Sequence, residues 1–182
     1  MRRRGALAMS KGLIIYKSKY GGTKKYVDIL KKELNCDICE VRDGKKAALD
    51  TYGWIVFAGG IYAGGIAGLS FLRKNCKVIR DVKSAILCVG ASPFDQKALE
   101  EIKAHNLKGE LSGIPVFYGR GIWDESRMSW KDRTLCKMLQ KAVAKKDSDA
   151  CEPWMRELLS AAGQIHDWTD RKYILPLLEY LQ

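Results

Sequence analysis

The chain has 182 residues, of which 47% are hydrophobic and 29% charged, a composition typical of one globular domain. This balance excludes wholesale disorder, and no stretch approaches the roughly 18 consecutive apolar residues of a membrane-spanning helix. The formal net charge of +11 favours anionic partners, but the chain has no nucleic-acid-binding motif, so no specific nucleic-acid partner is expected.

The first ten residues, 1–10, are expected to be an N-terminal extension, and residues 11–182 a single domain. The extension has three arginines followed by a short apolar stretch, as a secretion signal has. That stretch is too short for a signal, however, and a strand pattern follows almost at once. Met9 is a candidate alternative start.

Strand patterns and helix patterns alternate along most of the chain. Residues 12–16 form a continuous apolar run, which suits a central parallel strand buried on both faces. Residues 23–34 place Tyr26, Val27 and Leu30 on one side and lysines largely on the other, which predicts an amphipathic helix. The later predicted strands are 37–41, 54–58, 84–89 and 114–118, and the later helices are 67–79 and 95–105, with Asp95 as a candidate N-cap.

This alternation predicts the α/β class: a three-layer α/β/α sandwich with a five-stranded parallel sheet, right-handed crossovers and the strand order 2-1-3-4-5. Residues 120–165 are predicted to form a helical insertion after the fifth strand, with a basic helix at 128–146 and a short helix at 153–162. A last helix at 170–181, bent near Pro176, is expected to close the sheet.

The six cysteines are expected to be reduced structural thiols, the default for a cytoplasmic protein. Cys36 and Cys39 have the C-x-x-C spacing, but no second pair completes a zinc site. Both lie in a predicted strand, whereas a thioredoxin-like redox motif lies at the start of a helix. No metal site is therefore predicted.

The loop between the first strand and the first helix has the composition of a phosphate-binding site. A helix start offers free backbone N–H groups and a positive dipole end to an anion. Gly21 and Gly22 allow a tight turn and a close approach of the backbone. Ser18 and Thr23 add hydroxyl donors at either edge. The loop matches neither the Walker P-loop nor G-x-G-x-x-G, and a tight connection with a capping threonine is the alternative interpretation.

Two later strands also end in loops of small residues, 59–65 and 90–94. In an open α/β sheet, ligands bind beyond the carboxyl ends of the strands at the switch point in strand order, where these loops and the first converge. The first loop would hold a phosphate, and the later two would flank a planar ring. Tyr62 is the first candidate for stacking on the ring and Phe94 the second, with ordinary packing as the alternative for both. The predicted cofactor-binding residues are Ser18, Lys19, Tyr20, Gly21, Gly22, Thr23, Gly60, Ile61, Tyr62, Ala63, Gly64, Ala91, Ser92 and Phe94.

At these residues the chain resembles the flavodoxin family, over roughly residues 12–119. The phosphate loop of that family reads S/T-x-T-G-x-T, and Tyr20 departs from this pattern. The resemblance implies a flavodoxin-like fold and FMN as the cofactor, which supplies the electron chemistry. Tyr20 is expected to contact the phosphate through its backbone only. We therefore assign no catalytic acid or base, and neither His105 nor His166 lies in a predicted cofactor loop.

A narrower resemblance is to the flavodoxin-domain group that includes menaquinone-dependent protoporphyrinogen dehydrogenase. Three loose motifs resemble that group: the glycine-rich loop 59–65 with its aromatic residue, the basic and aromatic segment 118–146, and the tryptophan-containing segment 166–181. This resemblance implies membership of the group and not the same substrate.

Three functions are consistent with these features. The first is FMN-dependent oxidoreduction or electron transfer with a redox partner protein, and the net charge of +11 favours an acidic partner. The second is a quinone-linked dehydrogenase of the protoporphyrinogen-dehydrogenase type on the inner face of an anionic membrane, because the insertion places basic residues beside Trp130, Met138 and Leu139. The third is a cofactor-free flavodoxin-like binding module. Its response-regulator form is disfavoured because Lys17 and Lys19, rather than acidic residues, follow the first strand.

Overall fold

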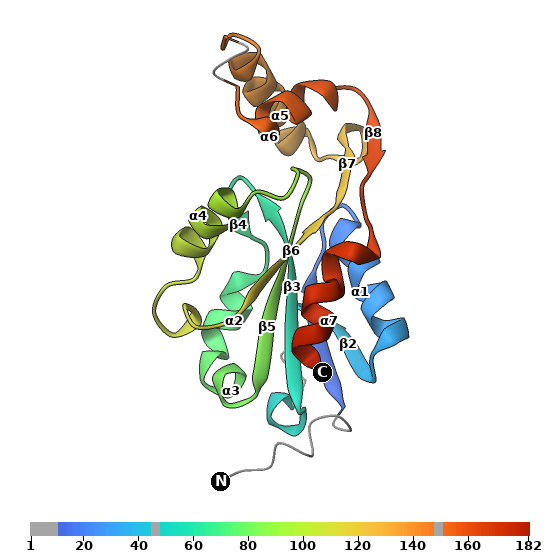
Figure 1. Ribbon diagram of the computed structural model, residues 1–182, viewed down its shortest axis with the longest axis vertical. Helices are drawn as coiled ribbons and strands as arrows, with labels where there is room; N and C mark the ends of the chain where they lie inside the picture. Colours follow the sequence, from blue (N-terminus) through green and yellow to red (C-terminus); the bar gives the residue numbers. More distant parts are fainter. Residues whose placement is uncertain (1–10, 45–47, 148–150) are drawn as a thin grey trace.

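A parallel sheet forms the centre of the computed structural model, which describes residues 11–44, 48–147 and 151–182 (Figure 1). The predicted N-terminal extension and Met9 lie outside the described residues. The strands of the sheet follow the order β2-β1-β3-β5-β6, which confirms the predicted order. They are β1 (Gly12–Lys17), β2 (Cys36–Glu40), β3 (Trp54–Tyr62), β5 (Lys83–Gly90) and β6 (Val116–Arg120). A short further strand, β4 (Gly65–Ile66), pairs antiparallel with the end of β3.

Helices cover both faces of the sheet, which confirms the predicted three-layer arrangement (Figure 1). One face carries α1 (Gly22–Glu33) and α7 (Leu175–Leu181). The opposite face carries α2 (Leu69–Lys74), α3 (Cys76–Asp81) and α4 (Gln96–Asn106). The Asp95 side chain caps α4 as predicted, by accepting a hydrogen bond from the N–H of Ala98 at 2.7 Å.

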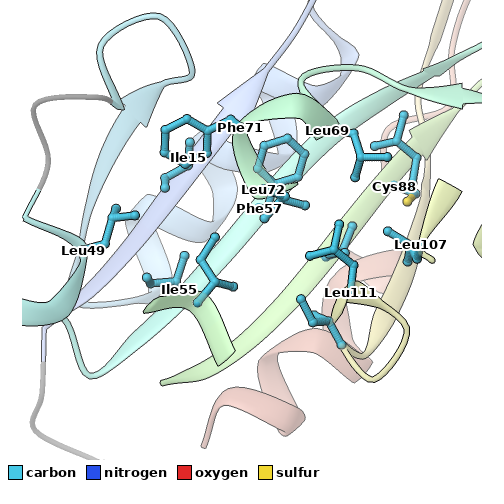
Figure 2. Packing of buried hydrophobic residues seen from close by; sticks show 14 of the residues in the cluster. Ile15, Leu49, Ile55, Phe57, Leu69, Phe71, Leu72, Cys88, Leu107 and Leu111 are labelled. Atoms are coloured by element: carbon cyan, nitrogen blue, oxygen red, sulfur yellow. The ribbon is translucent and has the colours of Figure 1, made fainter. Parts of the chain in front are cut away.

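The alternation of side chains along the strands divides the core into two clusters. In β1, Leu13 and Ile15 pack against α2 and α3, whereas Ile14 packs against α1 and α7. Figure 2 shows part of the first cluster, in which Phe71 and Leu72 of α2 lie over the strands. Because β1 is buried on both faces, every position in its centre must be apolar. Each such side chain stabilises the fold by about 1.5–3 kcal/mol.

The single helix predicted at 67–79 is wrong, because the segment forms two helices that meet at Asn75. The Nδ2 of Asn75 donates to the carbonyl of Phe71 at 2.8 Å. Its backbone N–H is shared between the carbonyls of Phe71 and Leu72, at 3.2 and 3.1 Å. Asparagine side chains compete in this way with the regular hydrogen bonds of a helix, and here the competition ends α2.

The last helix, predicted at 170–181 with a bend near Pro176, consists of two parts. Residues Arg171–Ile174 form a 3₁₀ turn, and α7 begins at Leu175, so Pro176 lies in the first turn of the helix. The missing N–H of proline costs nothing at this position, because the first N–H groups of a helix have no intrahelical partner. The proline therefore lies where the 3₁₀ turn ends and the α-helix begins.

The insertion is built on a two-stranded antiparallel ribbon that the sequence interpretation did not include. The ribbon consists of β7 (Ile122–Asp124), which follows β6, and β8 (Ile165–Asp167). Between these strands lie the two predicted helices, α5 (Trp130–Val143) and α6 (Pro153–Ser160). In Figure 1 both helices lie beyond the edge of the sheet at which the parallel strands end.

Candidate functional site

A cavity of about 380 Å³ lies at the carboxyl edge of the sheet, between the loops of the sheet and the insertion. Eight of the fourteen predicted cofactor-binding residues line it: Tyr20, Gly22, Thr23, Ile61, Tyr62, Ala63, Ala91 and Ser92. The insertion contributes mainly apolar side chains: Ile122, Trp123, Met128, Leu135, Cys136, Leu139, Trp154, Leu158 and Ala161. The three loops singled out in the sequence therefore meet at one cavity, which the insertion covers.

The first loop turns into helix α1 at Gly21. This residue has a φ of +94°, in the left-handed region that favours glycine, and its N–H donates to Ser18 Oγ at 3.1 Å. Ser18 therefore supports the turn and does not line the cavity. Thr23 does line the cavity, is 2% exposed and lies in the first turn of α1. This end of the cavity offers backbone donors and the positive end of a helix dipole.

The structure gives a second reason for a glycine at position 22, besides the close approach of the backbone to an anion. A Cβ at this position would lie 3.1 Å from the backbone nitrogen of Ile122 and 3.4 Å from the Cα of Gly121. These two residues begin the insertion, which therefore crosses directly over the start of α1. The contact joins residues far apart in the chain, so no local pattern could reveal it.

The hydroxyl of Tyr20 belongs to the cap of helix α5. Ser129 is the N-cap of α5, and its Oγ accepts from the N–H of Asp132 at 3.3 Å. In an ordinary capping box the carboxylate of the third helical residue would accept from the N–H of the N-cap. Here the N–H of Ser129 donates to the Tyr20 hydroxyl at 3.2 Å, and that hydroxyl donates to Asp132. The phenol thus completes the cap from outside the helix.

Lys19 also faces the insertion rather than the cavity. Its ammonium pairs with the carboxylate of Asp132, and its backbone N–H donates to the Tyr62 hydroxyl at 3.2 Å. The hydrogen bond to Asp132 raises the pKa of Lys19. The same bond, together with the one from Tyr20, lowers the pKa of Asp132.

The loop after β3 is a tight hairpin. Ala63 and Gly64 connect β3 to β4 with φ values of +47° and +76°, as in a type I′ turn. The buried side chain of Asn106 holds this hairpin: its Nδ2 donates to the Gly64 carbonyl at 2.7 Å, and its Oδ1 accepts from the Ile66 N–H at 3.1 Å. Sequence reasoning missed Asn106, because the end of a polar helix gives no local sign of such a contact.

Tyr62 lines the cavity and leans toward the first loop. Its ring makes an edge contact with the ring of Tyr20, with centroids 5.8 Å apart and an interplanar angle of 81°. It also covers Gly60, where a Cβ would lie 2.7 Å from the Tyr62 hydroxyl. Burial raises the pKa of Tyr62. Tyr62 therefore forms a wall between the first and second loops, with Gly60 beneath it.

Phe94 does not line the cavity. It is 52% exposed, and its ring lies 5.9 Å from that of Tyr118. Tyr118 lines the cavity and donates its hydroxyl to the Ser92 carbonyl at 2.6 Å. Tyr118 reaches the loop because β6 pairs in parallel with β5, with Cys88 opposite Tyr118. This register cannot be deduced from the sequence, so the role predicted for Phe94 stays a prediction, and Tyr118 is the aromatic residue that lines the cavity beside the third loop.

Arg120 joins the third loop to the insertion. Its Nε donates to the carbonyl of Ala91 at 3.0 Å, and its guanidinium pairs with Glu157 of α6. The same guanidinium lies 3.8 Å from the ring centroid of Trp168, which lines the cavity. These contacts hold the α6 side of the cavity against the sheet. Sequence reasoning gave no role to Arg120.

Trp123 lines the cavity, but its ring nitrogen is enclosed by the protein. It is 8% exposed, and its Nε1 has no hydrogen-bond partner within the described part of the chain. Buried donors are nearly always paired, so this nitrogen is an exception, and because it presents no surface to the cavity it offers no contact to a ligand. With the start of α1 at one end and apolar side chains elsewhere, the cavity fits a ligand that has an anionic group and an apolar ring.

The C-x-x-C pair forms no site of its own. Cys36 packs in the cluster beneath α1 and α7, whereas Cys39 packs against the cluster on the other face of the sheet. All six cysteines are free thiols. Among residues 11–44, 48–147 and 151–182 there is no group of three or more His, Cys, Asp or Glu side chains that could hold a metal ion.

Most of the chain is similar to a known family. A family model described as the flavodoxin domain matches residues 13–150. Among solved structures, a flavoprotein in complex with FMN from Lactobacillus acidophilus NCFM is 16% identical, with a TM-score of 0.45, over 60% of this chain and 91% of that chain. A flavodoxin, WrbA-like protein from Agrobacterium tumefaciens is 17% identical, with a TM-score of 0.48, over 68% of this chain and 88% of that chain. Among curated proteins, no sequence matches.

Proposed function

The chain belongs to the flavodoxin domain family, and on that premise we propose that it is a redox protein that binds FMN in the cavity at the carboxyl edge of its sheet. The observation that carries this proposal is that the start of α1 and the loops after β3 and β5 line the same apolar cavity. FMN requires donors for its phosphate and apolar walls for its ring system. The start of α1 with Thr23 meets the first requirement, and the apolar insertion meets the second.

The residues of the chain would hold and shield the cofactor, and bound FMN would supply the electron chemistry. The backbone N–H groups at the start of α1 and the hydroxyl of Thr23 would bind the phosphate. Tyr62, Tyr118 and Trp123 would border the ring. Helices α5 and α6 cover the cavity and would exclude water from it.

A flavin titration tests this proposal. The purified protein should quench the fluorescence of FMN and shift its visible spectrum, with a Kd in the micromolar range or below. Thr23→Val removes one hydroxyl with little change of volume and should weaken FMN binding about fivefold, while leaving the binding of riboflavin, which has no phosphate, unchanged. Thr51→Val, at the opposite edge of the sheet, is the matched control. Absence of FMN binding at micromolar concentrations would reject the proposal in favour of a cofactor-free module.

A second function, at a membrane surface, is favoured by helix α5. Trp130 and Met138 are 74% and 63% exposed. At 3.6 residues per turn, Met138 lies between the side of the helix that lines the cavity, with Leu135 and Leu139, and the side that carries Lys137 and Lys141. Such a pattern is typical of helices that lie in a membrane interface. No helix in the described ranges has the length and apolar character needed to cross a bilayer.

This second function is tested by sedimentation with lipid vesicles. Vesicles rich in anionic lipid should carry the protein down at low salt, and added salt should release it. The double substitution Trp130→Ser with Met138→Ser should weaken sedimentation without changing FMN affinity. A quinone should also reoxidise the reduced, FMN-loaded protein. Equal binding to neutral vesicles, or no vesicle binding and no effect of quinone, would remove this function.

A further inference from the structure

The first turn of helix α5 is fixed beside the first loop. Arg133 donates three hydrogen bonds, at 2.8 to 3.2 Å, to carbonyl groups in the turn before this helix. The preceding residue, Asp132, therefore has a defined position. Its carboxylate accepts hydrogen bonds from the ammonium of Lys19 and the hydroxyl of Tyr20, both in the proposed phosphate loop.

Asp132 acts as an internal anion for this loop. Its lowered pKa keeps it a carboxylate at neutral pH. A carboxylate and a phosphate ester are both oxygen acceptors that bind the same cationic and hydroxyl donors. A phosphate at the start of α1 would either take Lys19 from Asp132 or be repelled by the remaining carboxylate. In both cases the charge of Asp132 opposes phosphate binding.

Arg127 brings the opposite charge to the same loop. It lies in the short turn before α5, and its side chain is exposed. A Cβ built on Gly21 would lie 3.9 Å from the Nη1 of Arg127, the nearest atom beyond the neighbouring residues of the loop. The guanidinium is thus close to the backbone that would surround a phosphate, where it would attract a second negative charge.

We propose that the insertion sets the preference of the site for phosphorylated over unphosphorylated flavin, with Arg127 as the attractive contact and Asp132 as the opposing one. This inference rests on the proposed FMN function. With no phosphate bound, Asp132 holds Lys19 and Tyr20 against α5. When phosphate binds, Lys19 turns from Asp132 to the ligand.

The test compares the affinities of FMN and riboflavin, measured by fluorescence quenching, in matched variants of the full chain. Asp132→Asn should tighten FMN binding about fivefold, and Arg127→Gln should weaken it by a similar factor, while the Kd of riboflavin stays within about twofold of the unsubstituted protein. Asp81→Asn and Lys137→Gln change the net charge by the same amounts away from the loop, and both should leave the ratio of the two affinities unchanged.

Parallel changes for FMN and riboflavin would overturn the proposal, because a phosphate contact cannot affect riboflavin. Equal changes in the control variants would also overturn it, since they would show that the overall charge of the protein determines FMN affinity, and not the contacts of Asp132 and Arg127. Tyr20→Phe loosens the same cap without a change of charge, so an equal gain in FMN affinity in this variant would also overturn the proposal, because it would show that Asp132 acts by holding the insertion closed and not by its charge. If the unsubstituted protein binds neither flavin, the proposed function itself fails. If it binds both flavins but the Asp132 and Arg127 variants leave the ratio of the two affinities unchanged, only the inference fails.

Discussion

Tyr20 occupies a position where the flavodoxin loop pattern has a threonine, and its contacts account for the difference. The tyrosine hydroxyl connects Ser129 and Asp132 at the start of α5, a gap that the short side chain of threonine would not span. The residue therefore serves the insertion through its side chain. Its backbone remains in the loop that leads into α1, where the phosphate is proposed to bind.

Ala63 is the one residue other than glycine with a positive φ within the described ranges, at +47°. An alanine in this region costs roughly 1 kcal/mol that glycine would avoid. Ala63→Gly should therefore raise the free energy of unfolding by up to about 1 kcal/mol in urea denaturation. Ala98→Gly, in the regular helix α4, should lower it by about 0.5–1 kcal/mol. Destabilisation by both substitutions would contradict the assigned turn geometry.

The residues of the site fall into two groups: those whose contacts lie close to them in the sequence, and those whose contacts lie far away in it. The first loop could be predicted because Ser18, Gly21 and Thr23 lie within one strand–helix connection. Tyr118 and Asn106 could not, because they approach the loops from other strands and helices. Phe94 could be singled out because it lies in the third loop itself, whereas Tyr118 reaches that loop only through the pairing of β5 with β6.

At the scale of helices and strands, the strands that could be predicted from the sequence are those that are deeply buried. Strands β1, β3 and β5 are buried on both faces, and each is a continuous apolar run that could be predicted from its composition. The ribbon of β7 and β8 could not, because each strand has three residues and Ile165 is 70% exposed. The break between α2 and α3 depends on the side-chain hydrogen bond of Asn75, which competes with an otherwise helical pattern.

Asn106 should contribute more to stability than any other polar residue of α4. Its side chain bonds the Gly64 carbonyl, the Ile66 N–H and the Ile102 carbonyl, and it is 5% exposed. Asn106→Ala leaves these groups without their partner, so the free energy of unfolding should fall by about 2–3 kcal/mol. Asn35→Ala, at an exposed position, should change it by less than about 0.5 kcal/mol. A similar small change for both would show that the hairpin does not depend on Asn106.

The docking of α5 on the first loop should weaken in acid. Hydrogen bonds from Lys19 and Tyr20 lower the pKa of Asp132 in the folded state, so its contribution is present above the unfolded pKa of about 4. That contribution is lost as the pH falls through the folded pKa. The unsubstituted protein should therefore be more stable than Asp132→Asn at pH 7 in urea unfolding, and the difference should shrink below about pH 4. A difference that is constant or grows in acid would be inconsistent with this contact.

At the scale of the whole molecule, the net charge of +11 predicts that the protein attracts anions, but it does not predict where they bind. Composition alone could not show that the insertion covers the cavity, because its contacts at Gly22, Asp132 and Arg120 all join distant parts of the chain. The sandwich was predictable from the alternation of strands and helices. The cavity between the sheet and the insertion required the structure.

The charge of the whole molecule should make FMN affinity depend on salt. Between about 0.05 and 0.5 M salt, the Kd for FMN should rise several-fold, because screening weakens the attraction of a basic protein for a phosphate. The Kd for riboflavin should stay nearly constant over the same range. Equal salt effects on the two flavins would mean that the positive charge does not act on the phosphate.

The central claim is that the first loop and the start of α1 hold the phosphate of FMN while the insertion covers its ring. A crystal structure of the FMN complex tests this claim most directly. The account predicts the phosphate against the backbone of Gly21, Gly22 and Thr23, with Lys19 turned away from Asp132 and the ring between the sheet loops and α5 and α6. A structure with FMN elsewhere, or with Lys19 still paired with Asp132, would contradict it.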